Sequence, residues 1–127
     1  MTQKTIMVVD DSKFILKVVT DILSKGGYNV VIASDGLEAL EKLKNMKVDL
    51  LLIDFFMPQM SGRELCEKIR ADSNLKDVKL AFLTSAEFSP HGMKELENLN
   101  VLDYIKKSFV HNDLIQRVKK ILNGKNG

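Results

Sequence analysis

The chain has 127 residues, 45% of them hydrophobic, so we expect one compact domain over residues 1–127 with its own core. The formal net charge is +2 and acids and bases are interspersed, so composition does not argue for a nucleic-acid or membrane partner. The single cysteine excludes an internal disulfide framework and, with only two histidines, argues against a structural zinc site. Neither a signal peptide nor a membrane-spanning run is expected. These features favour a reducing, cytoplasmic setting.

Five short apolar runs alternate with segments of helical spacing. The runs are continuous, as strands buried on both faces require, and comprise Ile6 to Val9, Val30 to Ala33, Leu50 to Ile53, Leu80 to Leu83 and Val101 to Ile105. The apolar stripes of the five predicted helices are Phe14, Ile15, Val18, Val19, Ile22 and Leu23; Leu37, Leu40 and Leu43; Leu65, Cys66 and Ile69; Met93, Leu96 and Leu99; and Leu114, Ile115, Val118, Ile121 and Leu122. This alternation predicts an α/β fold, a doubly wound parallel sheet with helices on both faces. Residues 123–127 are expected to be a frayed tail.

Helix starts are well marked in the sequence. Asp35 to Glu38 and Ser61 to Glu64 have the spacing of capping boxes. Ser89 is followed by a proline at a first helical position, where its missing N–H is harmless. These caps place the starts of three predicted helices just after the loops that follow three predicted strands.

Acidic residues mark the ends of two predicted strands. Asp10 and Asp11 follow the first run, and Asp54 follows the third. If both runs are parallel strands of one sheet, the three carboxylates project from the same edge, where open α/β folds place their sites. Crowded oxygen ligands without Cys or His nearby favour Mg²⁺ or a similar divalent ion such as Mn²⁺, which also tends to recruit phosphate. The sequence is therefore interpreted first as a Mg²⁺-dependent, phosphate-handling site.

Polar residues also end the other two strands of interest. Thr84 and Ser85 end the fourth strand, and Lys106 and Lys107 follow the fifth. A hydroxyl and an ammonium at this edge could each hold a phosphoryl oxygen, one by hydrogen bond and one by charge.

With these motifs, the chain resembles the receiver domain of two-component response regulators, in its single-domain, chemotaxis-regulator-like form, over essentially its whole length. The resemblance is carried by Val8 to Ser12, by Asp54 with Pro58 and Gly62, by Leu83 to Ser85, and by Asp103 to Phe109. Each motif is weak alone, but together they occur in order and at matching strand ends. The resemblance implies a flavodoxin-like fold with five strands in the order 2-1-3-4-5 and five helices.

The resemblance also implies roles for the acids. Asp54 would be the phosphoacceptor, taking a phosphoryl group from a histidine kinase or a histidine phosphotransfer protein. Asp11 would ligate Mg²⁺ directly and Asp10 largely through water, and the Asp54 carboxylate and the backbone carbonyl of Phe56 would complete the protein ligands. The metal would offset repulsion between an anionic nucleophile and an anionic donor. Such a domain is expected to be a signalling switch that supports its own phosphorylation and dephosphorylation, not an enzyme.

The family's switch residues are implied in the same way. Thr84 would hydrogen-bond the phosphoryl group after transfer, and Lys107 would pair with it. Tyr104 would rotate into the space that Thr84 vacates, which repacks the face built from the fourth helix, the fifth strand and the fifth helix. This face is the expected surface for an unknown downstream protein and for dimerisation.

The chain departs from the family pattern after the lysine, where Ser108 replaces proline. A cis bond before a non-proline residue costs roughly 2.5 to 4 kcal/mol, so we predict a trans peptide and a shifted loop around Lys107. Lys106 is the competing candidate, although alternation along the strand would point it the other way. Asn100 stands where glycine commonly ends the fourth helix, and because asparagine tolerates the left-handed conformation better than most residues, this change should be mild.

Several functions remain open from sequence. The leading hypothesis is a stand-alone phosphoacceptor, because no effector domain follows the fifth helix. In such a domain the phosphoryl group should persist, because Phe56 and Ala86 offer no polar side chain to orient an attacking water. A degenerate receiver that binds partners without phosphorylation is the alternative; the intact acids argue against it and the Lys107–Ser108 loop weakly favours it. A phosphohydrolase would need an acid where Phe56 stands. A flavodoxin-like cofactor binder would need a Gly-, Ser- or Thr-rich phosphate loop after the first strand.

Overall fold

The computed structural model describes residues 3–85, 89–108 and 111–124. Its strands are β1 (Thr5–Val9), β2 (Asn29–Ala33), β3 (Leu50–Ile53), β4 (Lys79–Thr84) and β5 (Val101–Lys106), and its helices are α1 (Lys13–Lys25), α2 (Gly36–Leu43), α3 (Gly62–Ala71), α4 (Pro90–Glu95), the 3₁₀ helix η1 (Glu97–Leu99) and α5 (His111–Asn123). The strands form one parallel sheet in the order β2-β1-β3-β4-β5. The predicted doubly wound, flavodoxin-like fold is therefore confirmed. Residues 125–127 of the expected tail lie outside the described residues.

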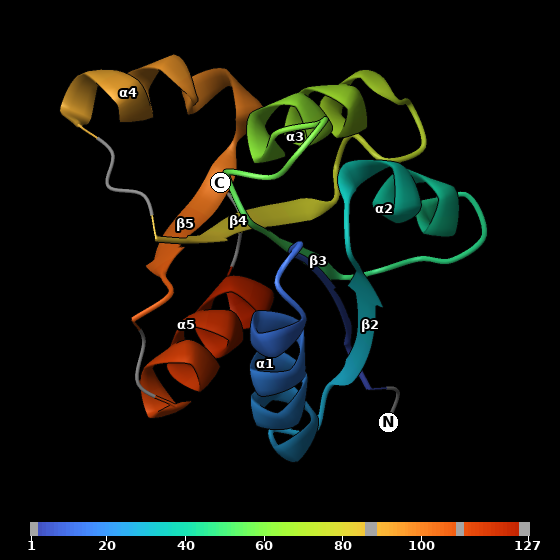
Figure 1. Cartoon of the computed structure of the whole chain (residues 1–127), viewed down its shortest axis with the longest axis vertical. Coiled ribbons are helices and arrows are strands. Elements are labelled where there is room, and N and C mark those ends of the chain that lie inside the picture. The colour runs from blue at the N-terminus through green and yellow to red at the C-terminus, as the bar shows by residue number, and fades with distance from the viewer. Residues whose placement is uncertain (1–2, 86–88, 109–110, 125–127) are drawn as a thin grey trace.

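The sheet is covered on both faces, with α2, α3 and α4 on one side and α1 and α5 on the other (Figure 1). Strand residues of one parity pack under the first group of helices and those of the other parity under the second, so the core has two halves. Residues 6–9 of β1 and 50–53 of β3 are fully buried, as continuous apolar runs predict. No helix in the described part of the chain is long and apolar enough to span a membrane.

Side-chain caps fix the helix starts at the edge of the sheet where the strands end. Asp35 accepts a hydrogen bond from the Glu38 backbone N–H at 2.7 Å, and Ser61 accepts one from the Glu64 N–H at 3.1 Å. The carboxylate of Glu38 reaches back one residue further than a capping box requires, to the Ser34 N–H at 2.8 Å. The predicted helix starts are thereby confirmed.

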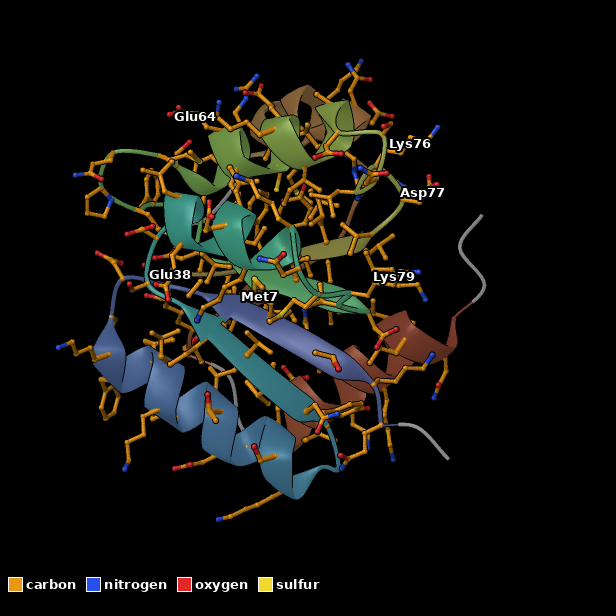
Figure 2. The ribbon with its side chains drawn as sticks, turned by 90° about the vertical axis from the view of Figure 1, so that its right-hand side faces the viewer. Met7, Glu38, Glu64, Lys76, Asp77 and Lys79 are labelled. Atoms are coloured by element: carbon orange, nitrogen blue, oxygen red, sulfur yellow. The ribbon has the colours of Figure 1, made fainter. Side chains whose placement is uncertain are left out.

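Figure 2 shows the two ends of the sheet. Glu38 and Glu64, in the first turns of α2 and α3, lie on one side of the molecule, and Lys76 and Lys79 lie on the opposite side, with Met7 of β1 between them. The helices run antiparallel to the strands, so their N-termini gather at the carboxyl end of the sheet. That end carries the functional residues.

The prediction that every residue of the apolar stripes is buried is wrong at three positions. Phe14, Leu37 and Met93 are 73%, 62% and 41% exposed. In α1, Leu16 is buried in place of Phe14, whereas Val19, Ile22 and Leu23 of the predicted stripe are buried as expected. In α2, Gly36 and Ala39 are buried in place of Leu37. A small residue such as Ala39 brings a helix close to the sheet, which a pattern of large apolar residues does not reveal.

Candidate functional site

Three acidic side chains meet at the carboxyl edge of the sheet. Val9 of β1 pairs with Ile53 of β3, so the residues that follow these strands emerge side by side. One carboxylate oxygen each from Asp10, Asp11 and Asp54 lies within 4.8 Å of the other two. Asp10 and Asp54 are buried, whereas Asp11 is exposed. The structure therefore brings together the three acids that the strand ends predicted.

Backbone hydrogen bonds hold the two buried acids in place. The Asp54 N–H donates to the Val9 carbonyl at 2.9 Å, which extends the β1–β3 ladder one residue past the strands. Asp10 Oδ1 accepts the Ser12 N–H at 2.8 Å, and Asp54 Oδ1 lies 3.4 Å from the Phe56 N–H. Burial raises the pKa of the Asp10 carboxyl, and the bond from Ser12 opposes that rise.

Lys107 lies between the acids. Its Nζ is 2.9 Å from Asp10 Oδ2 and 3.2 Å from Asp54 Oδ2. Asp10 Oδ2 is buried, and the Lys107 ammonium is its charged partner in this pocket. Burial would lower the pKa of Lys107, but its contacts with the two carboxylates raise it above the usual value, so the ammonium stays charged.

The backbone around Lys107 agrees with one sequence prediction. No peptide bond between described residues is cis, so the bond to Ser108 is trans as predicted. The Lys107 N–H donates to the Thr84 carbonyl at 3.0 Å, which ties the start of this loop to the end of β4. The sequence predicted Lys107 as the lysine of the site, with Lys106 as the competing candidate. The ammonium of Lys107 reaches the two buried acids.

The loop after Asp54 is pinned by close packing. Gly62 at the start of α3 donates its N–H to the Phe55 carbonyl at 2.8 Å. A Cβ at Gly62 would overlap the carbonyl oxygen of Asp54 and lie 2.9 Å from the Phe55 Cα, so the chain can approach only because this residue has no side chain. Within the loop, Gln59 has φ 70°, and the Met60 N–H closes a three-residue turn onto the Pro58 carbonyl at 2.7 Å.

The remaining predicted site residues lie nearby on the strands and loops. Thr84 is buried at the end of β4, and its register partner is Lys106. Tyr104 is half-buried on β5. Phe56 is 63% exposed beside the acceptor, and Ala86 lies outside the described residues.

The donor set fits a divalent cation. Three carboxylates against one ammonium leave a formal charge of 1 − 3 = −2 at the pocket, which an ion of charge +2 would balance. All the side-chain donors are hard oxygens, and the buried Asp10 Oδ2 already lies against a positive charge, Lys107 Nζ at 2.9 Å. Mg²⁺ and Mn²⁺ prefer such ligands.

A doubly wound sheet that gathers three acids and a lysine at its carboxyl edge defines the receiver class of signalling domain. The sequence matches the response regulator receiver domain over residues 6–119. The chain therefore belongs to this family, whose members accept a phosphoryl group in two-component systems.

Characterised relatives and solved structures agree with that assignment. The chain is 35% identical over 119 residues to the alkaline phosphatase synthesis transcriptional regulatory protein PhoP of Bacillus subtilis, covering 94% of this chain and 48% of that protein. It is 34% identical over 117 residues to hybrid signal transduction histidine kinase D of Dictyostelium discoideum, covering 92% of this chain and 7% of that protein. The chain thus spans about half or less of the length of these relatives.

Among solved structures, the chemotaxis protein CheY4 of Vibrio cholerae superposes with a TM-score of 0.89 at 30% identity, covering 95% of this chain and all of that one. A CheY-like receiver domain protein from Methanospirillum hungatei JF-1 gives a TM-score of 0.87 at 32% identity, covering 96% of this chain and 95% of that one.

Sequence reasoning missed two features of the site. It assigned Lys107 to the phosphoryl group but did not foresee that the ammonium bridges Asp10 and Asp54 beforehand. It also missed contacts among aromatic rings that lead away from the acceptor loop. The pair Phe55–Phe56 next to the acceptor was the one local sign of these contacts.

Proposed function

We propose that this protein is a stand-alone response regulator receiver that accepts a phosphoryl group on Asp54 from a phosphohistidine. The observation that carries the proposal is the shared pocket of Asp10, Asp11 and Asp54, whose carboxylate oxygens lie within 4.8 Å of one another, with Lys107 bridging two of them. The stand-alone form is supported by the match to the whole solved chain of the chemotaxis protein CheY4. The domain acts as a switch, not as an enzyme that turns over a separate substrate.

The residues of the pocket account for the transfer. Asp10, Asp11, Asp54 and the Phe56 carbonyl would hold Mg²⁺, or Mn²⁺ as an alternative, and the bound ion would supply positive charge where two anions approach each other. A carboxylate oxygen of Asp54 attacks the phosphorus, the bond from phosphorus to the donor imidazole nitrogen breaks, and that nitrogen keeps the electron pair and takes a proton from water. Lys107 transfers its contact from the resting carboxylates to a phosphoryl oxygen.

The surface around the acceptor supports a protein donor, either a histidine kinase or a histidine phosphotransfer protein. Phe14 in the first turn of α1, three residues after Asp11, and Phe56, two residues after Asp54, are 73% and 63% exposed, so each lies close in the sequence to an acid of the pocket. Isolated exposed apolar residues are ordinary, but aromatic residues beside a reactive group suit a protein partner. Because the exposed Phe56 side chain cannot orient water, the phosphorylated state should be long-lived.

The output is proposed to be the face of α4, β5 and α5, for an unknown downstream protein or for dimerisation. Thr84 would turn toward the phosphoryl group and Tyr104 would fill the space. Tyr104 supports this role because it is half-buried and lies on the strand between those two helices.

The test is phosphorylation by a small acyl phosphate with Mg²⁺, followed by intact mass measurement. The wild-type protein should gain one phosphoryl group, and a chelator should prevent the gain. Asp54→Asn should show none, whereas Asp77→Asn, at an exposed aspartate on the opposite edge, should behave as wild type. No gain in the wild type would favour a phosphorylation-independent interaction module, and a gain retained in Asp54→Asn would move the acceptor elsewhere.

A further inference from the structure

An unbroken run of aromatic contacts leads from the acceptor loop to β5. The Phe55 ring packs edge-on against Phe56, with centroids 4.9 Å apart, and against Phe82, with centroids 5.2 Å apart. Phe82 in turn lies 5.7 Å from Tyr104 at a tilt of 44°. Rings at these separations attract one another beyond the effect of burial alone. The run crosses three neighbouring segments: the loop after β3, then β4, then β5.

An irregularity in β5 brings Tyr104 into this run. Leu80 of β4 pairs with Val101, but Phe82 pairs with Tyr104, so a step of two residues on β4 matches a step of three on β5. Regular pairing would place Asp103 opposite Phe82. A bulge of this kind re-aims a side chain, and here it sets the Tyr104 ring beside Phe82.

The same bulge ties the Tyr104 backbone to α5. Asp103 Oδ1 accepts the Tyr104 N–H at 2.8 Å and also lies 3.0 Å from Arg117 Nη1. Arg117 Nε lies 3.3 Å from Asp113 Oδ2 one turn earlier on the helix. Tyr104 is thus held at its ring by Phe82 and at its backbone by a charged pair that reaches the proposed output face.

At the other end, Phe55 is fixed to the acceptor. It follows Asp54 directly in the chain, and its carbonyl accepts the Gly62 N–H at 2.8 Å. A change in the position of the Asp54 backbone would therefore pass to the Phe55 backbone and ring. Phe82, which the Phe55 ring contacts, is fully buried, and close-packed interiors transmit such displacements because they have little free volume.

We infer that Phe55 and Phe82 are positioning residues that couple the state of Asp54 to the rotamer of Tyr104 by packing, in parallel with Thr84. This inference rests on the proposed function. Thr84 lies two residues beyond Phe82 on β4 and so on the same side of the sheet, which lets the two residues act on Tyr104 separately.

The chain suits a direct test, because it has two tyrosines and no tryptophan. In a Tyr28→Phe background, tyrosine fluorescence and the signal of a fluorinated tyrosine report Tyr104 alone. Binding of Mg²⁺ with beryllofluoride is measured in parallel by calorimetry. Phe82→Leu should bind both ions yet lose at least half of the Tyr104 response at saturation. Thr84→Ala should keep part of the response, and the double variant should keep none.

The matched control is Leu80→Val, because Leu80 is also fully buried on β4, packs in the same half of the core and lies outside the run of rings. It should leave the Tyr104 response intact. If Phe82→Leu does not fold, Phe55→Leu, at a half-buried position, replaces it and should lose the Tyr104 response to the same extent. An undiminished response in both phenylalanine variants, an equal loss in Leu80→Val, or complete loss in Thr84→Ala alone would overturn the coupling. If the wild type binds neither ion, the proposed function fails and the coupling with it.

Discussion

Replacing Gly62 with alanine should destabilise the domain and weaken its binding of divalent cations at the same time. The new Cβ would overlap the Asp54 carbonyl oxygen and lie 2.9 Å from the Phe55 Cα and 3.1 Å from the Asp54 carbonyl carbon. All three are backbone atoms, so the strain cannot be relieved by a side-chain rotation and the acceptor loop must move. Overpacking of this kind costs about 1–3 kcal/mol, and the better helix propensity of alanine returns up to about 1 kcal/mol. We expect the free energy of unfolding to fall by about 1–2 kcal/mol.

Urea unfolding, first with a chelator and then with excess Mg²⁺, measures both effects. A cation that binds only the folded state stabilises it by RT ln(1 + [L]/Kd), so the Mg²⁺-dependent gain should be smaller in Gly62→Ala than in the wild type. Gly92→Ala in α4 is the matched control, because its Cβ would meet Ser89 Oγ at an ordinary 3.4 Å. That variant should be as stable as the wild type or slightly more so. Full stability and an unchanged Mg²⁺ effect in Gly62→Ala would refute the idea that close packing positions the acceptor.

Three further predictions concern charge and backbone strain. Lys107→Gln leaves two buried acids without their cation, so the free energy of unfolding in the presence of a chelator should fall by about 1–3 kcal/mol. Mg²⁺ should raise the melting temperature of this variant more than that of the wild type. Equal Mg²⁺ shifts in the two proteins would contradict this. Hydrogen bonds from Ser34 and the pairing with Lys42 lower the pKa of Glu38 from 4.5 to about 2. The wild type should therefore be more stable than Glu38→Gln, with the full difference above pH 4.5 and none left as the pH falls toward 2. Acid titrations of both proteins, followed by circular dichroism, measure this difference. Gln59→Gly should raise the urea stability by about 0.5–1 kcal/mol, because glycine adopts a φ of 70° without strain; a loss would mean that the glutamine side chain supports the loop.

The order and type of the elements could be predicted because each strand is a continuous apolar run between capped helices. The residues that each helix turns toward the sheet could not all be predicted, and Leu37 of α2 shows why. A hydropathy pattern gives weight to large side chains, whereas Gly36 and Ala39 decide how α2 sits because they allow close approach. Which apolar residues stay exposed is settled by this packing.

The acids of the site could be predicted because a parallel sheet brings the ends of β1 and β3 together whatever the loops do. The aromatic run could not, since it depends on the register between β4 and β5. The bulge that aligns Phe82 with Tyr104 leaves no mark in the local composition, and one residue of slip would remove the contact. Non-local pairing therefore created the feature that sequence reasoning missed.

The loop at Ser108 shows that contacts with a neighbouring strand can keep a site residue in place when the local sequence changes. Loss of the family's proline was the one feature of the sequence that favoured a phosphorylation-independent module. The Lys107 N–H donates to the Thr84 carbonyl at 3.0 Å, so the end of β4 holds the lysine backbone. Its flexible four-carbon stem then carries Nζ to within 3.2 Å of Asp54 Oδ2. Because the ammonium reaches the acceptor with serine in place of proline, the substitution gives no reason to expect a chain that cannot be phosphorylated.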